Sequence, residues 1–184
     1  MKTLLCYFNT RVLSFDELDK ITGHNPKKFT WMSKAILWLS SKGFHVYHIE
    51  SLDYAKFARS GKKYLRTIWN TKTFKIQDTM SDLKEEQKDA TKLLTNKHIT
   101  LLNNRLNIND IQSLFKIGFF IMLSINPNIL EGSQKYGAHM VVVAGFKNKK
   151  VRLCDPDHGF KWYDESTVGR AMNKKDFSVT LISR

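Results

Sequence analysis

The sequence predicts an α+β fold in a single domain that spans residues 1–184. A length of 184 residues suits one domain, and a hydrophobic content of 42% is sufficient for a core. The patterning changes along the chain, because helical spacings dominate its first part and β-branched segments dominate its last third. We therefore expect a helical lobe that packs against an antiparallel sheet.

Start and stop signals define the first two helices. Ser14 and Glu17 have the spacing of a capping box, which predicts a helix that ends by Gly23. Thr30 can cap a second helix, which Gly43 ends. The apolar face of this second helix consists of Met32, Ala35, Ile36 and Leu39.

Further along, β-branched and aromatic content predicts a short strand over residues 44–50. Residues 51–69 indicate one or two short helices that break at Gly61. A polar helix follows from Ser81-Asp82 to about Leu94, with acidic residues early and lysines late, as the helix dipole favours. Another helix is expected over residues 107–117.

The remaining segments are typical of strands. Residues 119–125 form a continuous apolar run between Gly118 and Pro127, which predicts a strand buried on both faces. Residues 140–146 and 151–155 form a predicted hairpin around the polar turn 147–150. Two more strand-like segments follow, at 160–163 and 177–183.

Composition excludes a disordered tail, a collagen-like repeat and a small disulfide scaffold. The chain has 30 Lys and Arg against 17 Asp and Glu, a net charge of +13, which favours an acidic partner. The basic residues are scattered and neither cluster nor alternate with aromatic residues. This distribution argues against nucleic acid as the partner.

Cysteine content and hydropathy indicate a soluble, cytoplasmic protein. The two cysteines, Cys6 and Cys154, do not make an oxidising framework. The longest apolar run, residues 119–125, is far shorter than the ~20 residues of a transmembrane helix. The apolar stretch at the N-terminus is shorter than the roughly 7–15 residues of a secretory signal.

His139 and Asp155 are the candidate catalytic residues. His139 precedes the valine-rich strand, and Asp155 ends its hairpin partner, directly before Pro156. A carboxylate beside an imidazole holds the ring tautomer and stabilises its charged form, as a general base requires.

The hairpin must have one particular register for this pair to form. An even-length tight loop would set Asp155 opposite Val142, on the other face from His139, whereas a bulge near Gly145 would bring the two together. Spacing alone favours the other interpretation, a capped strand end with an incidental histidine and a turn-forming Asp-Pro.

The segments GAHMVVVAGF and VRLCDPDHG resemble the His and Asp motifs of papain-like cysteine peptidases of the bacteriocin-processing type, which cut leader peptides after a double glycine. The upstream segments SFDELDKITG and FTWMSKAILWLSSKGFHV are similar to the helix pair of that family and its following strand. The resemblance covers nearly the whole chain and implies a papain-like fold.

By this resemblance, His139 is the general base and Asp155 orients it. The family also needs a cysteine at the start of a long central helix, where the helix N-terminus lowers the pKa of the thiol, and a preceding glutamine. Cys6 is the only upstream cysteine, but too few residues separate it from the helix at Ser14, and no glutamine precedes it. Cys6 therefore fits better as a buried small hydrophobe near the end of that helix.

Other candidate residues carry no predicted chemistry. Asp157 and His158 could join His139 in a metal site, but the spacing of a structural zinc site is absent, so no metal and no cofactor is expected. His45 and His48 lie on opposite faces of a strand and are interpreted as surface and packing residues. The remaining candidates are interpreted as core or groove-wall residues: Cys154, Trp31, Trp38, Trp69 and Trp162.

The sequence thus predicts a cysteine-peptidase-like protein that acts on peptide or protein substrates. Either the nucleophile lies on a segment upstream of Met1, or the chain is an inactive relative that binds a peptide or an acidic partner without cutting it. A basic nucleic-acid-binding protein is the alternative from another class, and it would lose affinity steeply with salt.

Overall fold

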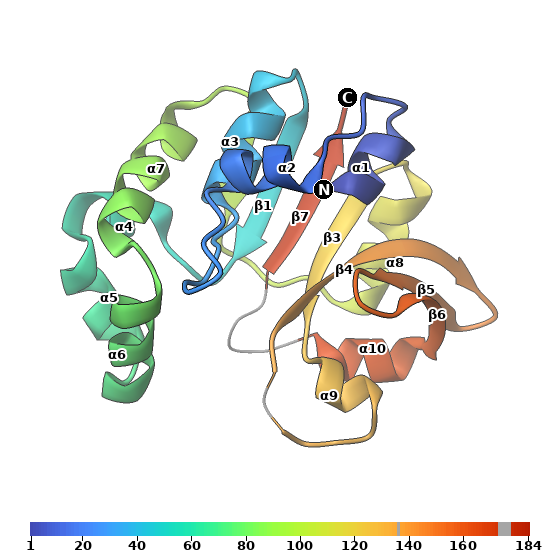
Figure 1. Cartoon of the computed structure of the whole chain (residues 1–184). Helices are drawn as coiled ribbons and strands as arrows, with labels where there is room; N and C mark the ends of the chain where they lie inside the picture. The colour runs from blue at the N-terminus through green and yellow to red at the C-terminus, as the bar shows by residue number, and fades with distance from the viewer. Residues whose placement is uncertain (136, 173–177) are drawn as a thin grey trace. The chain divides into compact units, whose positions relative to one another are not determined.

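The computed structural model describes residues 1–135, 137–172 and 178–184, and the chain divides into two compact units (Figure 1). The first unit comprises residues 1–46 and 52–101, and the second comprises residues 47–51 and 102–184. Both helices and strands are present, which confirms the α+β class. The expectation of a single domain stays a prediction.

The first unit is mainly helical. Ser14 and Glu17 form the predicted capping box, and Gly23 ends the helix in the left-handed conformation, with φ of 65°. The predicted break at Gly61 and the helix that follows Asp82 are also present. The helices are α1 (Lys2–Tyr7), α2 (Phe15–Thr22), α3 (Ser33–Ser41), α4 (Tyr54–Ser60), α5 (Lys62–Ile68), α6 (Thr71–Met80) and α7 (Leu83–Thr95).

The predicted cap of α3 is wrong. Met32, not Thr30, precedes the helix, and its side chain makes no capping bond. Thr30 Oγ1 lies instead 3.1 Å from Nδ1 of His24. Ser33, the first residue of α3, hydrogen-bonds to Glu86 of α7. A side chain from a distant segment thus lies at this helix end, a tertiary contact that local patterns do not specify.

Among the described residues, seven strands form one sheet in the order β2-β1-β7-β3-β4-β5-β6. The sheet is mixed, which corrects the expectation of an antiparallel sheet. The neighbouring pairs β7–β3, β3–β4, β4–β5 and β5–β6 are antiparallel. The last predicted strand is present from Ser178, and Phe177 lies outside the described residues. The strands are β1 (His45–Glu50), β2 (Ile99–Leu102), β3 (Phe120–Ile125), β4 (His139–Lys147), β5 (Lys150–Asp155), β6 (Gly159–Asp164) and β7 (Ser178–Ser183).

The core of the second unit surrounds β3, which is buried along its whole length as its apolar run predicts. The helices in the described part of this unit are α8 (Ile108–Lys116), α9 (Pro127–Leu130) and α10 (Glu165–Ala171). Ile111 of α8 and Val168 of α10 pack into the same core. Within the described ranges, no helix combines the length and the apolar character needed to cross a membrane.

Candidate functional site

The strand ladder and a closed loop fix the position of His139. His139 begins β4, where it pairs with Ile125 at the end of β3. Between the two strands, Asn126 is 7% exposed, and its side-chain amide donates to the carbonyl of Lys135 at 2.9 Å. Asn126 Oδ1 accepts a hydrogen bond from the backbone N–H of Asn128. The backbone that enters β4 is therefore held at both sides of the loop.

The β4–β5 hairpin closes on a two-residue turn, Asn148-Lys149. Both residues have positive φ, 50° and 58°, as a type I′ turn requires. With an unbroken ladder, this even loop would place Asp155 opposite Val142 and on the sheet face away from His139.

A bulge changes that register. The pairing shifts by one residue just before Gly145, so Cys154 rather than Asp155 lies opposite Val142. Because successive side chains of a strand alternate between faces, Asp155 then shares a face with His139. The predicted bulge near Gly145 is confirmed, and Cys154 points to the opposite face.

His139 and Asp155 are in direct contact. His139 Nε2 lies 3.1 Å from Asp155 Oδ1, and their side chains are 24% and 14% exposed. A carboxylate can only accept, so the bonded Nε2 carries the proton and Nδ1 of the neutral ring keeps its lone pair. The tautomer that a general base needs is thus set by Asp155.

Backbone donors hold the carboxylate in place. Asp155 Oδ1 also accepts from the backbone N–H groups of Asp157 at 2.8 Å and His158 at 3.2 Å. Burial by itself would raise the pKa of Asp155, but the Asp157 N–H and the His139 ring outweigh it and hold that pKa below its usual value. Asp155 is therefore ionised at neutral pH.

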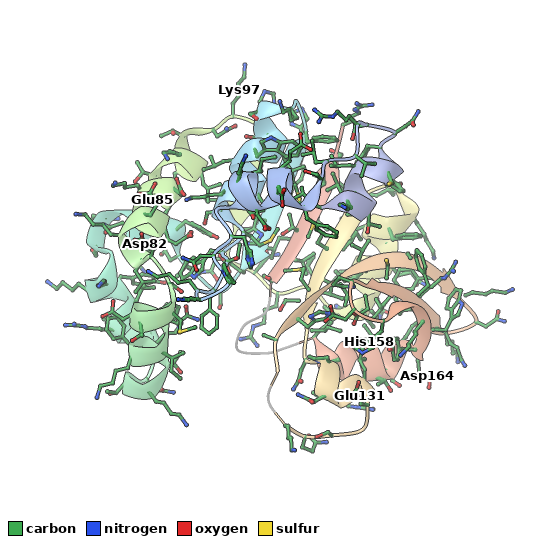
Figure 2. All side chains as sticks on the ribbon, viewed as in Figure 1. Asp82, Glu85, Lys97, Glu131, His158 and Asp164 are labelled. Carbon is green, nitrogen blue, oxygen red and sulfur yellow. The ribbon has the colours of Figure 1, made fainter. Side chains whose placement is uncertain are left out.

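A pocket of about 230 Å³ adjoins the pair. Burial raises the pKa of its Tyr163, and the nearby carboxylates of Asp155 and Glu131 raise it further. Figure 2 labels two of the residues that line it, Glu131 and His158, and the complete lining is Pro127, Leu130, Glu131, Asp155, His158, Lys161 and Tyr163. The pocket can receive one side chain with both polar and apolar parts.

The side chains of His139, Asp155 and Asp157 offer metal-ligand atoms. One ligand atom from each of His139, Asp155 and Asp157 lies within 4.8 Å of the other two. His158 Nδ1 lies 3.5 Å from Asp155 Oδ1. A histidine nitrogen with carboxylate oxygens is a ligand set that first-row divalent metals use.

Cys6 differs from its prediction. It is exposed on α1 in the first unit, whereas Leu4 and Leu5 occupy the buried positions of that helix. Cys6 therefore is not a buried hydrophobe. Cys154 is half-buried, on the sheet face opposite to Asp155.

The predicted roles of His45 and His48 as surface and packing residues are confirmed. His45 is exposed, whereas His48 is 2% exposed and its Nδ1 lies 2.8 Å from Thr180 Oγ1. Trp162 is not a core residue, because it is 45% exposed, and its role as a groove wall stays a prediction.

Trp162 belongs to a surface that sequence reasoning missed. Phe160, on the same strand, is 56% exposed, and the Arg152 guanidinium lies 4.5 Å from the centre of its ring. Arg152 pairs with Trp162 across β5 and β6. The signal was present in the alternation of aromatic and basic residues in FKWY, on a strand that lies at the sheet edge.

The fold and the site define an α+β protein with an oriented His–Asp pair beside a pocket. No protein-family model matches the chain, and no curated protein matches it. The resemblance to bacteriocin-processing peptidases therefore stays a prediction.

Proposed function

We propose that the chain is a papain-like, cysteine-peptidase-like protein that acts on or binds peptides through the His139–Asp155 pair. The 3.1 Å contact between His139 Nε2 and Asp155 Oδ1 carries the proposal, because it leaves Nδ1 as the basic nitrogen of an oriented imidazole. A one-residue difference in the hairpin register would separate the two side chains. The bulge that brings them to one face is therefore consistent with a functional pair.

The proposed chemistry is general-base catalysis. His139 Nδ1 would take the proton from a thiol as its sulfur attacks the peptide carbonyl, and the ionised Asp155 would stabilise the imidazolium that forms. The imidazolium would then protonate the leaving amine. The pocket of about 230 Å³ next to Asp155 would receive one side chain of the peptide.

The proposed protein hydrolyses peptides if a nucleophilic thiol is present beside His139, and only binds them if it is not. Cys6 is exposed, so it is available to solvent as a nucleophile in this proposal. If neither Cys6 nor another cysteine supplies the thiol, His139 and Asp155 would bind a peptide without cutting it. With a net charge of +13, the chain would favour an acidic peptide in either case.

The test uses a library of peptides that includes double-glycine leader sequences. Cleavage is followed by mass spectrometry, and binding is followed by fluorescence anisotropy, for the wild type and for H139A, D155N and C6S. The control is H24A, because His24 is an exposed histidine of the first unit. We expect H139A and D155N to lose at least tenfold in cleavage or in affinity, and H24A to behave as the wild type.

The outcomes separate the two forms of the proposal. Cleavage that disappears in C6S identifies Cys6 as the nucleophile, whereas binding without cleavage in every variant identifies a peptide-binding relative. A wild type that neither cuts nor binds any peptide of the library contradicts both forms. Equal behaviour of H139A and wild type also contradicts them.

A second candidate function rests on the exposed surface of Arg152, Phe160 and Trp162. Aromatic faces beside cationic groups stack on bases and contact phosphates, so this surface favours single-stranded nucleic acid. Filter binding of an oligonucleotide at 50 and 200 mM salt tests it, with W162A and R152A against the controls F15A and R59A, which replace an exposed aromatic and an exposed basic residue of the first unit. Absence of binding at the lower salt concentration excludes this function.

A further inference from the structure

His139 lies beside two carboxylates, those of Asp155 and Asp157, in a chain with a net charge of +13. Within the described part of the chain, the ion pairs of Asp155 and Asp157 involve histidines only: His139 with both aspartates and His158 with Asp155. Histidine in its neutral form brings no positive charge. Among the described residues, no Lys or Arg forms an ion pair with either carboxylate, although the chain has 30 Lys and Arg and Lys161 lines the adjoining pocket.

The distances in this cluster suit a small metal ion. Two ligand atoms bound at 2.0–2.1 Å to a tetrahedral centre are roughly 3.4 Å apart. His139 Nε2 lies 3.1 Å from Asp155 Oδ1 and 3.9 Å from Asp157 Oδ2, so the observed separations lie on either side of that value. The Asp157 side chain is 71% exposed, so it can adjust by the few tenths of an ångström required.

The Asp157 carboxylate lies near His139, although it takes no part in the hydrogen bonds of the turn. The backbone N–H groups of Asp157 and His158 already satisfy the turn by donating to Asp155 Oδ1. The Asp157 carboxylate takes no part in those bonds, yet one of its oxygens faces His139 Nε2. The backbone bonds orient Asp155 as an outer shell orients a metal ligand.

The adjoining pocket provides space for the rest of a coordination sphere. Asp155 lines both the cluster and the pocket of about 230 Å³, and His158 lines the pocket as well. That volume holds several water molecules. Three protein ligands with an open side toward water are the arrangement of a metal centre that exchanges ligands, rather than of a closed structural site.

We infer that His139, Asp155 and Asp157 form a binding site for a divalent first-row metal ion such as Zn²⁺. Two carboxylates neutralise the charge of the ion, and the imidazole supplies the nitrogen ligand. The sequence suggests Asp157 and His158 as partners of His139 but lacks the spacing of a structural zinc site, because the ligands come from the start of β4, the end of β5 and the turn that follows.

Metal binding would change the function of His139. The ion takes the lone pair of Nε2, so the single proton of the neutral ring moves to Nδ1 without net proton release. His139 then has no free nitrogen to accept a proton from a thiol. This consequence rests on the proposed function and makes the metal an inhibitor of it, whereas the site itself rests on the geometry alone.

The test titrates the full chain with Zn²⁺ by calorimetry and with Co²⁺ by visible absorption. Both titrations use a C6S background, because the exposed Cys6 would bind these metals on its own. We expect one ion per chain and the absorption of Co²⁺ in a site of low coordination number. D157N removes one ligand and leaves the His139–Asp155 contact intact. D16N is the matched control, because Asp16 is an exposed aspartate of α2.

We expect D157N to weaken Zn²⁺ binding at least about tenfold, since even the loss of an outer-shell partner costs 10–100-fold. D16N should bind as the background does, and circular dichroism verifies that both variants fold. A chain that binds neither metal, or equal affinity in D157N and D16N, overturns the inference and leaves the peptide proposal unaffected. Metal binding without any action on peptides supports the site and contradicts only its inhibitory role.

Discussion

Replacement of Glu86 by glutamine should stabilise the protein above neutral pH. Glu86 lies on α7 with 9% of its surface exposed, and its Oε2 has no hydrogen-bond partner among the described residues. Burial raises the pKa of Glu86 from 4.5 to about 7; the hydrogen bond to Ser33 opposes this change, and the nearby Asp89 adds to it. Between pH 4.5 and about 7, the folded protein therefore keeps a proton on Glu86 that the unfolded chain has released.

The free energy follows from that difference in pKa. A difference of one in pKa corresponds to 1.36 kcal/mol, so the change from 4.5 to about 7 corresponds to about 3 kcal/mol as an upper value. Because the folded pKa is the higher one, this contribution to stability is complete below pH 4.5 and is lost as the pH rises through about 7. Glutamine has the same length, can still bond Ser33 and carries no charge at any pH.

Urea unfolding at pH 5 and pH 8, followed by circular dichroism, measures the effect. E86Q should exceed the wild type by less than about 1 kcal/mol at pH 5 and by up to about 3 kcal/mol at pH 8. The control is E85Q, because Glu85 is the neighbouring acid that forms a surface ion pair with Lys88. An equal gain at both pH values, or no gain at pH 8, would refute the assignment of a buried charge at Glu86.

Four further substitutions have expected outcomes in the same unfolding assay. S14A should lower stability by about 1 kcal/mol through loss of the capping bond to Glu17. L123A should cost about 2–5 kcal/mol, because Leu123 is 0% exposed in the core of the second unit. K149G should stabilise the hairpin by about 1 kcal/mol, since Lys149 has φ of 58° and glycine adopts this conformation freely. D155N should destabilise the protein at pH 7 and have no effect at the lowest pH values. The pKa of Asp155 is lowered in the folded state, so its contribution to stability is present above pH 3.8 and is lost as the pH falls through the folded pKa.

Elements with strong local signals were predictable from the sequence. The capping box at Ser14, the break at Gly61 and the apolar run of β3 all specify their structures within a few residues. In contrast, α10 was not predicted, because its seven residues include Thr167, Val168 and Gly169, which are poor helix formers. Its burial of Val168 and Ala171 against the core supplies the stabilisation that propensity does not.

Exposure was the least predictable property of single residues. Cys6 and Trp162 were interpreted as buried or groove-lining, since both residue types usually are, and both are exposed. Burial depends on which other elements cover a face, and a local pattern does not contain that information. Phe160 and Trp162 are exposed on β6, which is the last strand of the sheet and pairs on one side only among the described strands.

The contact between His139 and Asp155 is decided by residues other than these two. Side chains alternate along a strand, so the number of residues between the two positions determines whether they share a face. The two-residue turn at Asn148-Lys149 gives the wrong parity, and the one-residue shift before Gly145 corrects it. A sequence with the same histidine and aspartate but without that shift would place the imidazole and the carboxylate on opposite faces of the sheet. The residues of the turn and the bulge therefore carry as much information about this site as the His and Asp motifs do.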